Sequence, residues 1–412
     1  MTDSRTHPAA PDAVALTGAL VALAGAALLP LAELRANRLV PGTLESLGVA
    51  GALALPVWVA LAVGFAAAFA PASAARPRLA RLAAWGLVGA TAWALGAACS
   101  RLLEGQPAVA RVSIGAGAWV LLAGAAVLGF AGRDRAFTPA GGSPKRGERA
   151  AAGRTARVVV MRLLAPAAGI AAVVLAFTSG GLDQLSLARE YAVRADSFWQ
   201  LLLGHVTLSA AALAAGLAIG VPLGLAATRN RRVRAVALGV TGIIQTVPSL
   251  ALLGLLVVPL AALGAAYPVL RELGIRGIGA APGLIALTLY ALLPIVRNTY
   301  VGLSEVDQGA IDAGRGMGMS SAQLLTRVEL PLALPLIIEG VRTAAVLLVG
   351  ITTLTVFAGA RNLGILIFEG LGQFAPDLIL LGAIPTIALA LVADLGLSAL
   401  GRALTPEGVR AP

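Results

Sequence analysis

The chain has 412 residues, of which 58% are hydrophobic and only 12% are charged, and its formal net charge is +11. Soluble domains are roughly half apolar and about one quarter charged, so this composition excludes a soluble enzyme, a disordered chain and a disulfide scaffold. Apolar runs of about twenty residues have the length of a transmembrane helix, whereas a membrane β-barrel shows shorter alternating segments. We therefore expect an all-α, polytopic helical membrane protein with about ten transmembrane helices.

In chain order, the expected hydrophobic spans are 13–32, 46–70, 80–100, 113–132, 158–179, 200–228, 236–261, 282–302, 336–358 and 377–400. Segment 133–157 is rich in Gly, Pro, Ser and charge, which predicts a flexible, basic cytoplasmic linker. It separates a four-helix N-terminal membrane extension, 1–132, from a six-helix core, 158–412. Polar groups are costly in lipid, so the richer polar content of the core predicts that function lies there.

Arginine is concentrated in alternate loops, at 76–81, 133–157 and 229–234. Cytoplasmic loops carry an excess of positive charge, so both termini are expected in the cytoplasm and the chain in the cell membrane. This topogenic role accounts for the net charge, and no nucleic-acid partner is expected.

Few residues are available for chemistry. The single lysine, Lys145, lies in Pro144-Lys145-Arg146, which excludes a Walker A nucleotide site. Two histidines and one cysteine leave no basis for a metal cluster or an intrachain disulfide. We therefore expect no catalytic residue and no metal ligand, which argues against an integral-membrane enzyme.

The connection 303–335 is amphipathic. Ser320 or Ser321 can cap a helix whose one face carries Leu324, Leu325 and Val328. A tight turn between two short helices is permitted by Gly314, Gly316 and Gly318. Pro331 and Pro335 are expected to break the helix and start the next span. Two short helices at the membrane surface suit docking into a groove of a cytoplasmic partner.

This connection resembles the EAA loop of importer permeases of the ABC superfamily. The matching positions, at the family's spacing, are Asp312, Ala313, Gly314, Gly318, Val328, Leu330 and Pro331. Asp312 replaces the usual glutamate, and Gly314 replaces the second alanine. The resemblance implies that loop 303–335 couples this chain to a separate ABC ATPase subunit. That partner would use ATP and Mg, and this chain would bind no cofactor and be no enzyme.

The flanking segments resemble permeases of osmoprotectant importers, which carry glycine betaine, choline, carnitine and related quaternary amines; they are 204–234, 243–257, 287–303 and 342–364. The resemblance implies an extracytoplasmic solute-binding protein and a second permease, either a copy or a paralogue. Many such permeases fuse the binding domain to their C-terminus, and since this chain stops at Pro412 we expect a separate binding protein. The alternatives are an ion-driven secondary transporter or an ABC permease for another small amino-acid-like solute.

Candidate residues of the translocation pathway are polar groups within the core spans, namely Gln245, Ser249, Tyr290, Asn298 and Thr353. The alternative is interhelical hydrogen bonding, worth about 0.6 kcal/mol on average. Tyr290 could offer its ring face to a quaternary ammonium group, but a packed helix residue is the interpretation we favour. Thr353 could instead bond to its own preceding turn.

Four charged or titratable residues complete the prediction. Glu339 and Arg342, three positions apart on a helix, are expected to pair. His205 starts the span 200–228 and is expected to be an interfacial anchor. Asp394 lies toward the other face, and two isolated groups at opposite faces do not form a proton relay, so ion coupling is not favoured.

Overall fold

The computed structural model describes residues 11–37, 40–71, 75–132 and 164–404, so the predicted linker 133–157 lies outside the described residues. The chain divides into two compact units, Met1–Val193 and Arg194–Pro412. Within the described ranges, seven helices are long and apolar enough to cross a membrane, and three shorter apolar helices accompany them. The predicted class, a helical membrane protein with about ten apolar helices, is confirmed.

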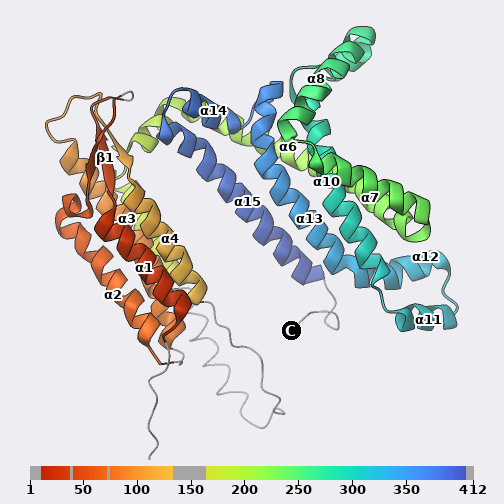
Figure 1. The fold of residues 1–412 in the computed structure, drawn as a ribbon, viewed down its shortest axis with the longest axis horizontal. Coiled ribbons are helices and arrows are strands. Elements are labelled where there is room, and N and C mark those ends of the chain that lie inside the picture. Colours follow the sequence, from red (N-terminus) through yellow and green to blue (C-terminus); the bar gives the residue numbers. More distant parts are fainter. Residues whose placement is uncertain (1–10, 38–39, 72–74, 133–163, 405–412) are drawn as a thin grey trace, which may run out of the picture. The chain divides into compact units, whose positions relative to one another are not determined.

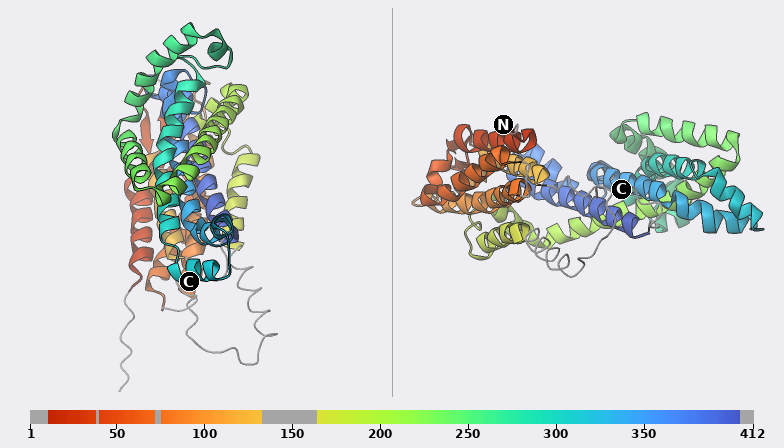
Figure 2. Two further views of the ribbon diagram at one scale, coloured as in Figure 1. Left: turned by 90° about the vertical axis from the view of Figure 1, so that its right-hand side faces the viewer. Right: turned by 90° about the horizontal axis from the view of Figure 1, so that it is seen from below.

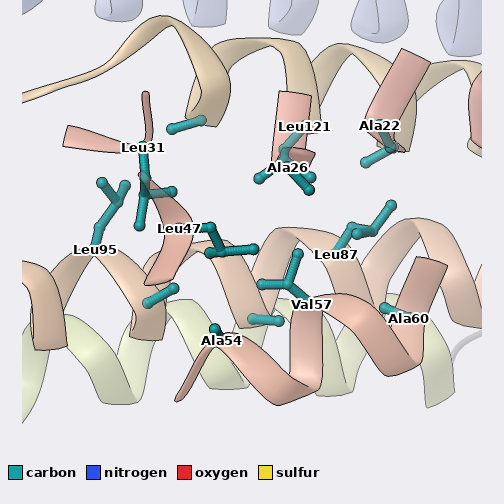
Figure 3. Packing of buried hydrophobic residues seen from close by; sticks show 14 of the residues in the cluster. Ala22, Ala26, Leu31, Leu47, Ala54, Val57, Ala60, Leu87, Leu95 and Leu121 are labelled. Atoms are coloured by element: carbon teal, nitrogen blue, oxygen red, sulfur yellow. The ribbon is translucent and has the colours of Figure 1, made fainter. Parts of the chain in front are cut away.

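The N-terminal unit consists mainly of the helices α1 (Ala13–Leu28), α2 (Leu55–Phe69), α3 (Ala75–Leu102), α4 (Ala116–Ala131) and Leu164–Thr178, with the 3₁₀ segment η1 (Leu47–Ala54) before α2. Glycines bring α1 and α4 together, because a Cβ on Gly124 would lie 2.5 Å from the backbone nitrogen of Ala22. Small residues of this kind let helix backbones pack closely in lipid. Figure 3 shows the buried core of this unit, where Val57 and Leu87 from α2 and α3 lie close together.

A small antiparallel sheet in the N-terminal unit was not predicted. Its strands are β1 (Ala32–Arg35), β2 (Thr43–Glu45) and β3 (Arg111–Ile114), in the order β2-β1-β3. Ala32 pairs with both Glu45 and Ile114. Strand β1 directly follows α1, and strand β3 directly precedes α4. The packing of α1 on α4 therefore brings β1 and β3 together. Sequence periodicity cannot indicate such a non-local pairing in segments of three or four residues.

The C-terminal unit contains most of α6 (Ser186–Arg229), which begins in the N-terminal unit. Its further elements are α7 (Arg231–Thr246), α8 (Ser249–Ala266), α9 (Pro268–Glu272), α10 (Ala280–Ser304), α11 (Gln308–Gly316), α12 (Ser321–Leu324), the π-helical turn η2 (Leu325–Glu329), α13 (Leu330–Thr352), the 3₁₀ turn η3 (Thr353–Ala358), α14 (Gly364–Gly372) and α15 (Pro376–Leu404). The core lies where α6, α10 and α13 meet, around Leu287, Ile295 and Leu348. Gly216 and Gly220 of α6 approach α10 so closely that added Cβ atoms would lie 2.8 Å from its side chains.

One predicted span is divided at a proline, and one prediction about proline was wrong. The predicted span 236–261 is two helices, α7 and α8, which Figures 1 and 2 show in green. Val247 is extended, with φ −72° and ψ 129°, because the residue before a proline avoids the helical region. By contrast, Pro331 and Pro335 do not break their helix, which runs from Ser321 to Ala358. The π turn η2 ends just before Pro331, and a wider turn accommodates a residue that cannot donate the usual bond.

Candidate functional site

The loop between α10 and α13 forms two short helices, α11 and α12, at the same end of α10 and α13 (Figure 1). Asp307 caps α11 by accepting a hydrogen bond from the Ala310 nitrogen at 3.1 Å. Ser320, rather than Ser321, caps α12. Its hydroxyl accepts from the Gln323 nitrogen at 3.3 Å, and the Gln323 side chain accepts from the Ser320 nitrogen at 2.9 Å. The predicted helix–turn–helix is therefore present, with both helices capped.

The inner face of this loop is packed against the ends of α10 and α13. Ile311 of α11 and Leu324 of α12 are buried in one cluster with Leu303 and Ala333. Gly314 faces the same cluster, and a Cβ there would lie 2.7 Å from the Leu324 side chain. Glycine at this position therefore lets α11 and α12 pack closely, and the loop is fixed to the two long helices.

The outer face of the loop is exposed. Asp312, Ala313 and Gly318 are exposed, and Met317 is 71% exposed although it is apolar. Asp312 accepts a hydrogen bond from Arg315, three positions along the same helix, at 3.2 Å. Gly318 has φ +77°, a conformation that favours glycine.

The motif residues thus divide between the two faces. Gly314 is buried, while Val328, Leu330 and Pro331 are half-buried where the loop enters α13. Asp312, Ala313 and Gly318 remain available to a partner.

An ion pair joins the end of this loop to α6. Glu329, in the π turn η2, accepts a hydrogen bond from Arg229 at 2.5 Å, and the Glu329 side chain is only 5% exposed. Sequence reasoning missed this pair. The signal was an acidic residue inside the apolar run 328–337, because a carboxylate is buried only with a partner.

A second polar group lies at the break between α7 and α8. The side-chain amide of Gln245 donates to the Tyr290 carbonyl at 3.0 Å, and the Tyr290 hydroxyl donates to the Val247 carbonyl. Tyr290 is 5% exposed, which agrees with a packed helix residue. These two bonds attach the break to α10. Ser249 is half-buried in the first turn of α8.

The other two candidate pathway residues bond within their own helices. Asn298 donates to the Pro294 carbonyl at 2.8 Å and lies against Gly340, whose added Cβ would be 2.6 Å from the Asn298 Cβ. Thr353 donates to the Gly350 carbonyl at 2.7 Å. Gln245 and Tyr290 are thus brought together at the α7–α8 break, whereas Asn298 lies about two turns farther along α10.

The prediction that His205 is an interfacial anchor was wrong. It is fully buried, and its Nε2 lies 3.0 Å from the Val349 carbonyl of α13. One turn farther along α6, the hydroxyls of Ser209 and Thr352 are 2.8 Å apart. Because α6 begins at Ser186, His205 lies about five turns inside the helix rather than at its start.

The predicted pair of Glu339 and Arg342 is confirmed, at 3.1 Å. Arg342 also donates to Asp394 of α15 at 2.5 Å, an interhelical contact that was not predicted. The charge of Asp394 is therefore matched by a neighbouring cation, which argues further against a proton relay.

Two protein families match this chain. Residues 216–406 match the family described as binding-protein-dependent transport system inner membrane component. Residues 11–135 match the N-terminal domain of the ABC transporter permease YehY.

Curated relatives match about half of this chain and most of their own length. The carnitine transport permease protein OpuCB of Listeria monocytogenes is 42% identical over 212 residues, covering 52% of this chain and 88% of its own. The choline transport system permease protein OpuBB of Bacillus subtilis is 39% identical, covering 50% and 88%. The osmoprotectant import permease protein OsmW of Salmonella typhimurium is 38% identical, covering 51% and 93%. The chain therefore belongs to the family of binding-protein-dependent transport system inner membrane components, the membrane-spanning permeases of ABC importers.

Proposed function

We propose that this permease carries a quaternary-amine osmoprotectant, such as glycine betaine, choline or carnitine, into the cell. The observation that supports it is identity of 38–42% to permeases named for carnitine, choline and osmoprotectant transport. This level of identity over most of each relative's length favours the substrate class over another amino-acid-like solute. It also favours an ATP-driven importer over an ion-driven transporter.

ATP is hydrolysed by a partner subunit that docks on loop 303–335. The exposed face of α11, with Asp312 and Ala313, supports this role, and so does the exposed apolar side chain of Met317. The inner face is packed on α10 and α13, so a displacement of the docked ATPase moves the ends of both helices with it. The buried pair of Glu329 and Arg229 extends that connection to α6.

The loop faces the cytoplasm, and both termini lie on that side. Arg229 belongs to the basic group 229–234, and its contact with Glu329 puts the loop on the same face as that group. Positive charge is concentrated on the cytoplasmic face of membrane proteins, which supports this orientation. A solute-binding protein then delivers the substrate at the opposite face of the cell membrane.

A second permease copy or paralogue packs beside α7 and α8 and completes the translocation pathway. The observation that supports it is the exposed apolar face of α7, where Val236, Val240 and Ile243 are 64%, 50% and 67% exposed. Substrate passes near the α7–α8 break. Gln245 and Tyr290 hold this break in shape through backbone bonds. Ser249, Thr353 and Asn298 are the remaining polar candidates along the pathway.

The first test is copurification of partners from native membranes in mild detergent, with identification by mass spectrometry. Ala313→Arg places a large cation on the exposed face of α11. Ala403→Arg makes the same change at an exposed position in the last turn of α15 and serves as the matched control. We expect a protein with a Walker A motif to copurify with wild type and with Ala403→Arg, and to be lost with Ala313→Arg. Equal recovery with all three chains would contradict the docking site.

The second test is uptake into proteoliposomes that contain the copurified complex and its binding protein. ATP-dependent accumulation of radiolabelled glycine betaine, choline or carnitine is the expected result. Uptake of only another amino-acid-like solute would overturn the substrate class but not the ATP-driven mechanism. Uptake driven by an ion gradient without ATP would overturn both.

A further inference from the structure

A groove with a volume of about 560 Å³ lies on the N-terminal unit, between α2, α3 and the helix Leu164–Thr178. This volume is in the range of sites that bind small molecules. The lining is apolar, and large side chains at its rim are open to the surroundings. Val59 is 55% exposed, Leu82 is 54% exposed and Trp93 is 37% exposed.

Two of the helices that line the groove, α3 and Leu164–Thr178, are in close contact. A Cβ on Gly89 of α3 would lie 2.8 Å from the Cβ of Ala172, and a Cβ on Gly169 would lie 2.9 Å from the Trp85 ring. The indole nitrogen of Trp93 donates to the Ala172 carbonyl at 3.0 Å. The helix Leu164–Thr178 is therefore attached to α3 along the base of the groove.

A positive charge lies at one end of the groove. The groove-lining positions of α3 include Leu82, Trp85, Gly89 and Trp93, which recur every three or four residues. Arg78 lies one turn before Leu82 on the same stripe and is exposed. The two nearby arginines already donate hydrogen bonds to the backbone: Arg76 donates to the Ala70 carbonyl, and Arg81 donates to the Pro77 carbonyl. Within the described parts of the chain, no hydrogen bond or ion pair is found for Arg78, and the first turn of α3 has no acidic residue.

We propose that this groove binds an acyl chain of an anionic phospholipid, with the lipid phosphate at Arg78. An arginine at the bilayer surface attracts an anionic headgroup, and the N-terminus of a long helix adds a partial positive charge. The apolar groove begins one turn deeper, where the acyl chain of a lipid held at Arg78 would lie. This site is independent of the transported substrate and of the ATPase partner.

The lining suits a lipid chain better than a helix from a second protein chain. Helices associate in lipid through small residues at their contact surface. Here the small residues Gly89 and Ala172 are already packed against each other, while the large side chains of Val59 and Leu82 are exposed along the groove. A flexible acyl chain can lie between these large side chains, whereas a rigid helix would meet them before it reached a continuous surface of small residues.

The test uses the two groove tryptophans as reporters. The chain has five tryptophans, so Phe replaces Trp58, Trp119 and Trp199, and Trp85 and Trp93 remain. The full chain is reconstituted in phosphatidylcholine vesicles that contain a minority of dibrominated lipid, which quenches fluorescence on contact. The dibrominated lipid is phosphatidylglycerol in one sample and phosphatidylcholine in the other.

We expect brominated phosphatidylglycerol to quench as if enriched about fivefold over brominated phosphatidylcholine, the preference conferred by one basic side chain at a bilayer surface. Arg78→Gln should abolish that preference, and Arg232→Gln, an exposed arginine of α7, should leave it unchanged. Gly86→Leu places a large side chain in the groove, where an added Cβ lies 3.4 Å from the Ala60 Cβ, and should reduce quenching by both lipids.

Equal quenching by the two brominated lipids in the parent chain would overturn the proposal, and so would an unchanged preference in Arg78→Gln. Absence of quenching by either lipid would show that another protein chain covers the groove, which would also overturn it. Arg78 is exposed, so its variant tests the headgroup contact even if Gly86→Leu does not fold.

Discussion

Replacement of Gly318 by alanine tests the backbone conformation that loop 303–335 requires. Gly318 has φ +77°, and no atom lies within 4 Å of the place where a Cβ would be added. The cost of Gly318→Ala is therefore conformational and not steric. Gly316 provides a matched control in the same loop. No atom lies within 4 Å of a Cβ added there either, but the φ of Gly316 is not in the left-handed region.

The expected cost of alanine in the left-handed region is about 1–2 kcal/mol. This destabilisation raises the population of the opened turn by about 5–30-fold. Gly316→Ala should have no such cost, because alanine is the better residue at a helical position. Gly318→Asn should destabilise the turn less than Gly318→Ala, because asparagine adopts the left-handed conformation more readily than alanine.

Hydrogen exchange measured by mass spectrometry on peptides covering 308–324, with the chain in nanodiscs, reports these changes directly. We expect exchange in Gly318→Ala to be about 5–30-fold faster than in wild type, and exchange in Gly316→Ala to match wild type. Recovery of the ATPase in the copurification assay should be lower with Gly318→Ala than with Gly318→Asn, and unchanged with Gly316→Ala. If alanine at both positions gives the same exchange rate, the left-handed conformation of Gly318 is not what shapes the loop, and the reasoning is refuted.

Three further changes test other parts of the structure. Tyr290→Phe removes the bond to the Val247 carbonyl and should destabilise the α7–α8 break by about 1 kcal/mol, seen as faster exchange there with other regions unchanged. Gly124→Leu should lower the thermal unfolding temperature through a loss of about 1–3 kcal/mol or more, because α1 leaves no room for a Cβ; a wild-type temperature would contradict the close packing. The hydrogen bond from Arg35 holds the pKa of Glu33 below its ordinary value of 4.5, so the carboxylate stabilises the fold above that pH. Glu33→Gln should be less stable than wild type at neutral pH, and the difference should disappear as the pH falls below 4.5; a constant difference across this range would refute the ionic contribution.

Much of the candidate site was predictable because it depends on local chemistry. Local patterns indicated a cap at Ser320 or Ser321, and Ser320 forms it; they also indicated the pair of Glu339 with Arg342, three positions apart on one helix. The reciprocal bond to the Gln323 side chain was not predicted. Of the three glycines predicted to form the turn, Gly318 does so, whereas Gly314 and Gly316 belong to α11. The pairs of Glu329 with Arg229 and of Arg342 with Asp394 join residues 100 and 52 positions apart, and no local pattern indicates which partner a buried charge will find.

The membrane class, the apolar spans and the two short helices of loop 303–335 follow from the sequence alone, because hydrophobic length, periodicity and capping act over a few turns of one helix. The tertiary structure decided the rest. It buried His205 between α6 and α13, separated α7 from α8 against α10, and paired β1 with β3. It also formed the apolar groove beside Arg78. Each of these features depends on which helices pack together, and that choice rests on close contacts of small residues whose partners lie far away in the chain.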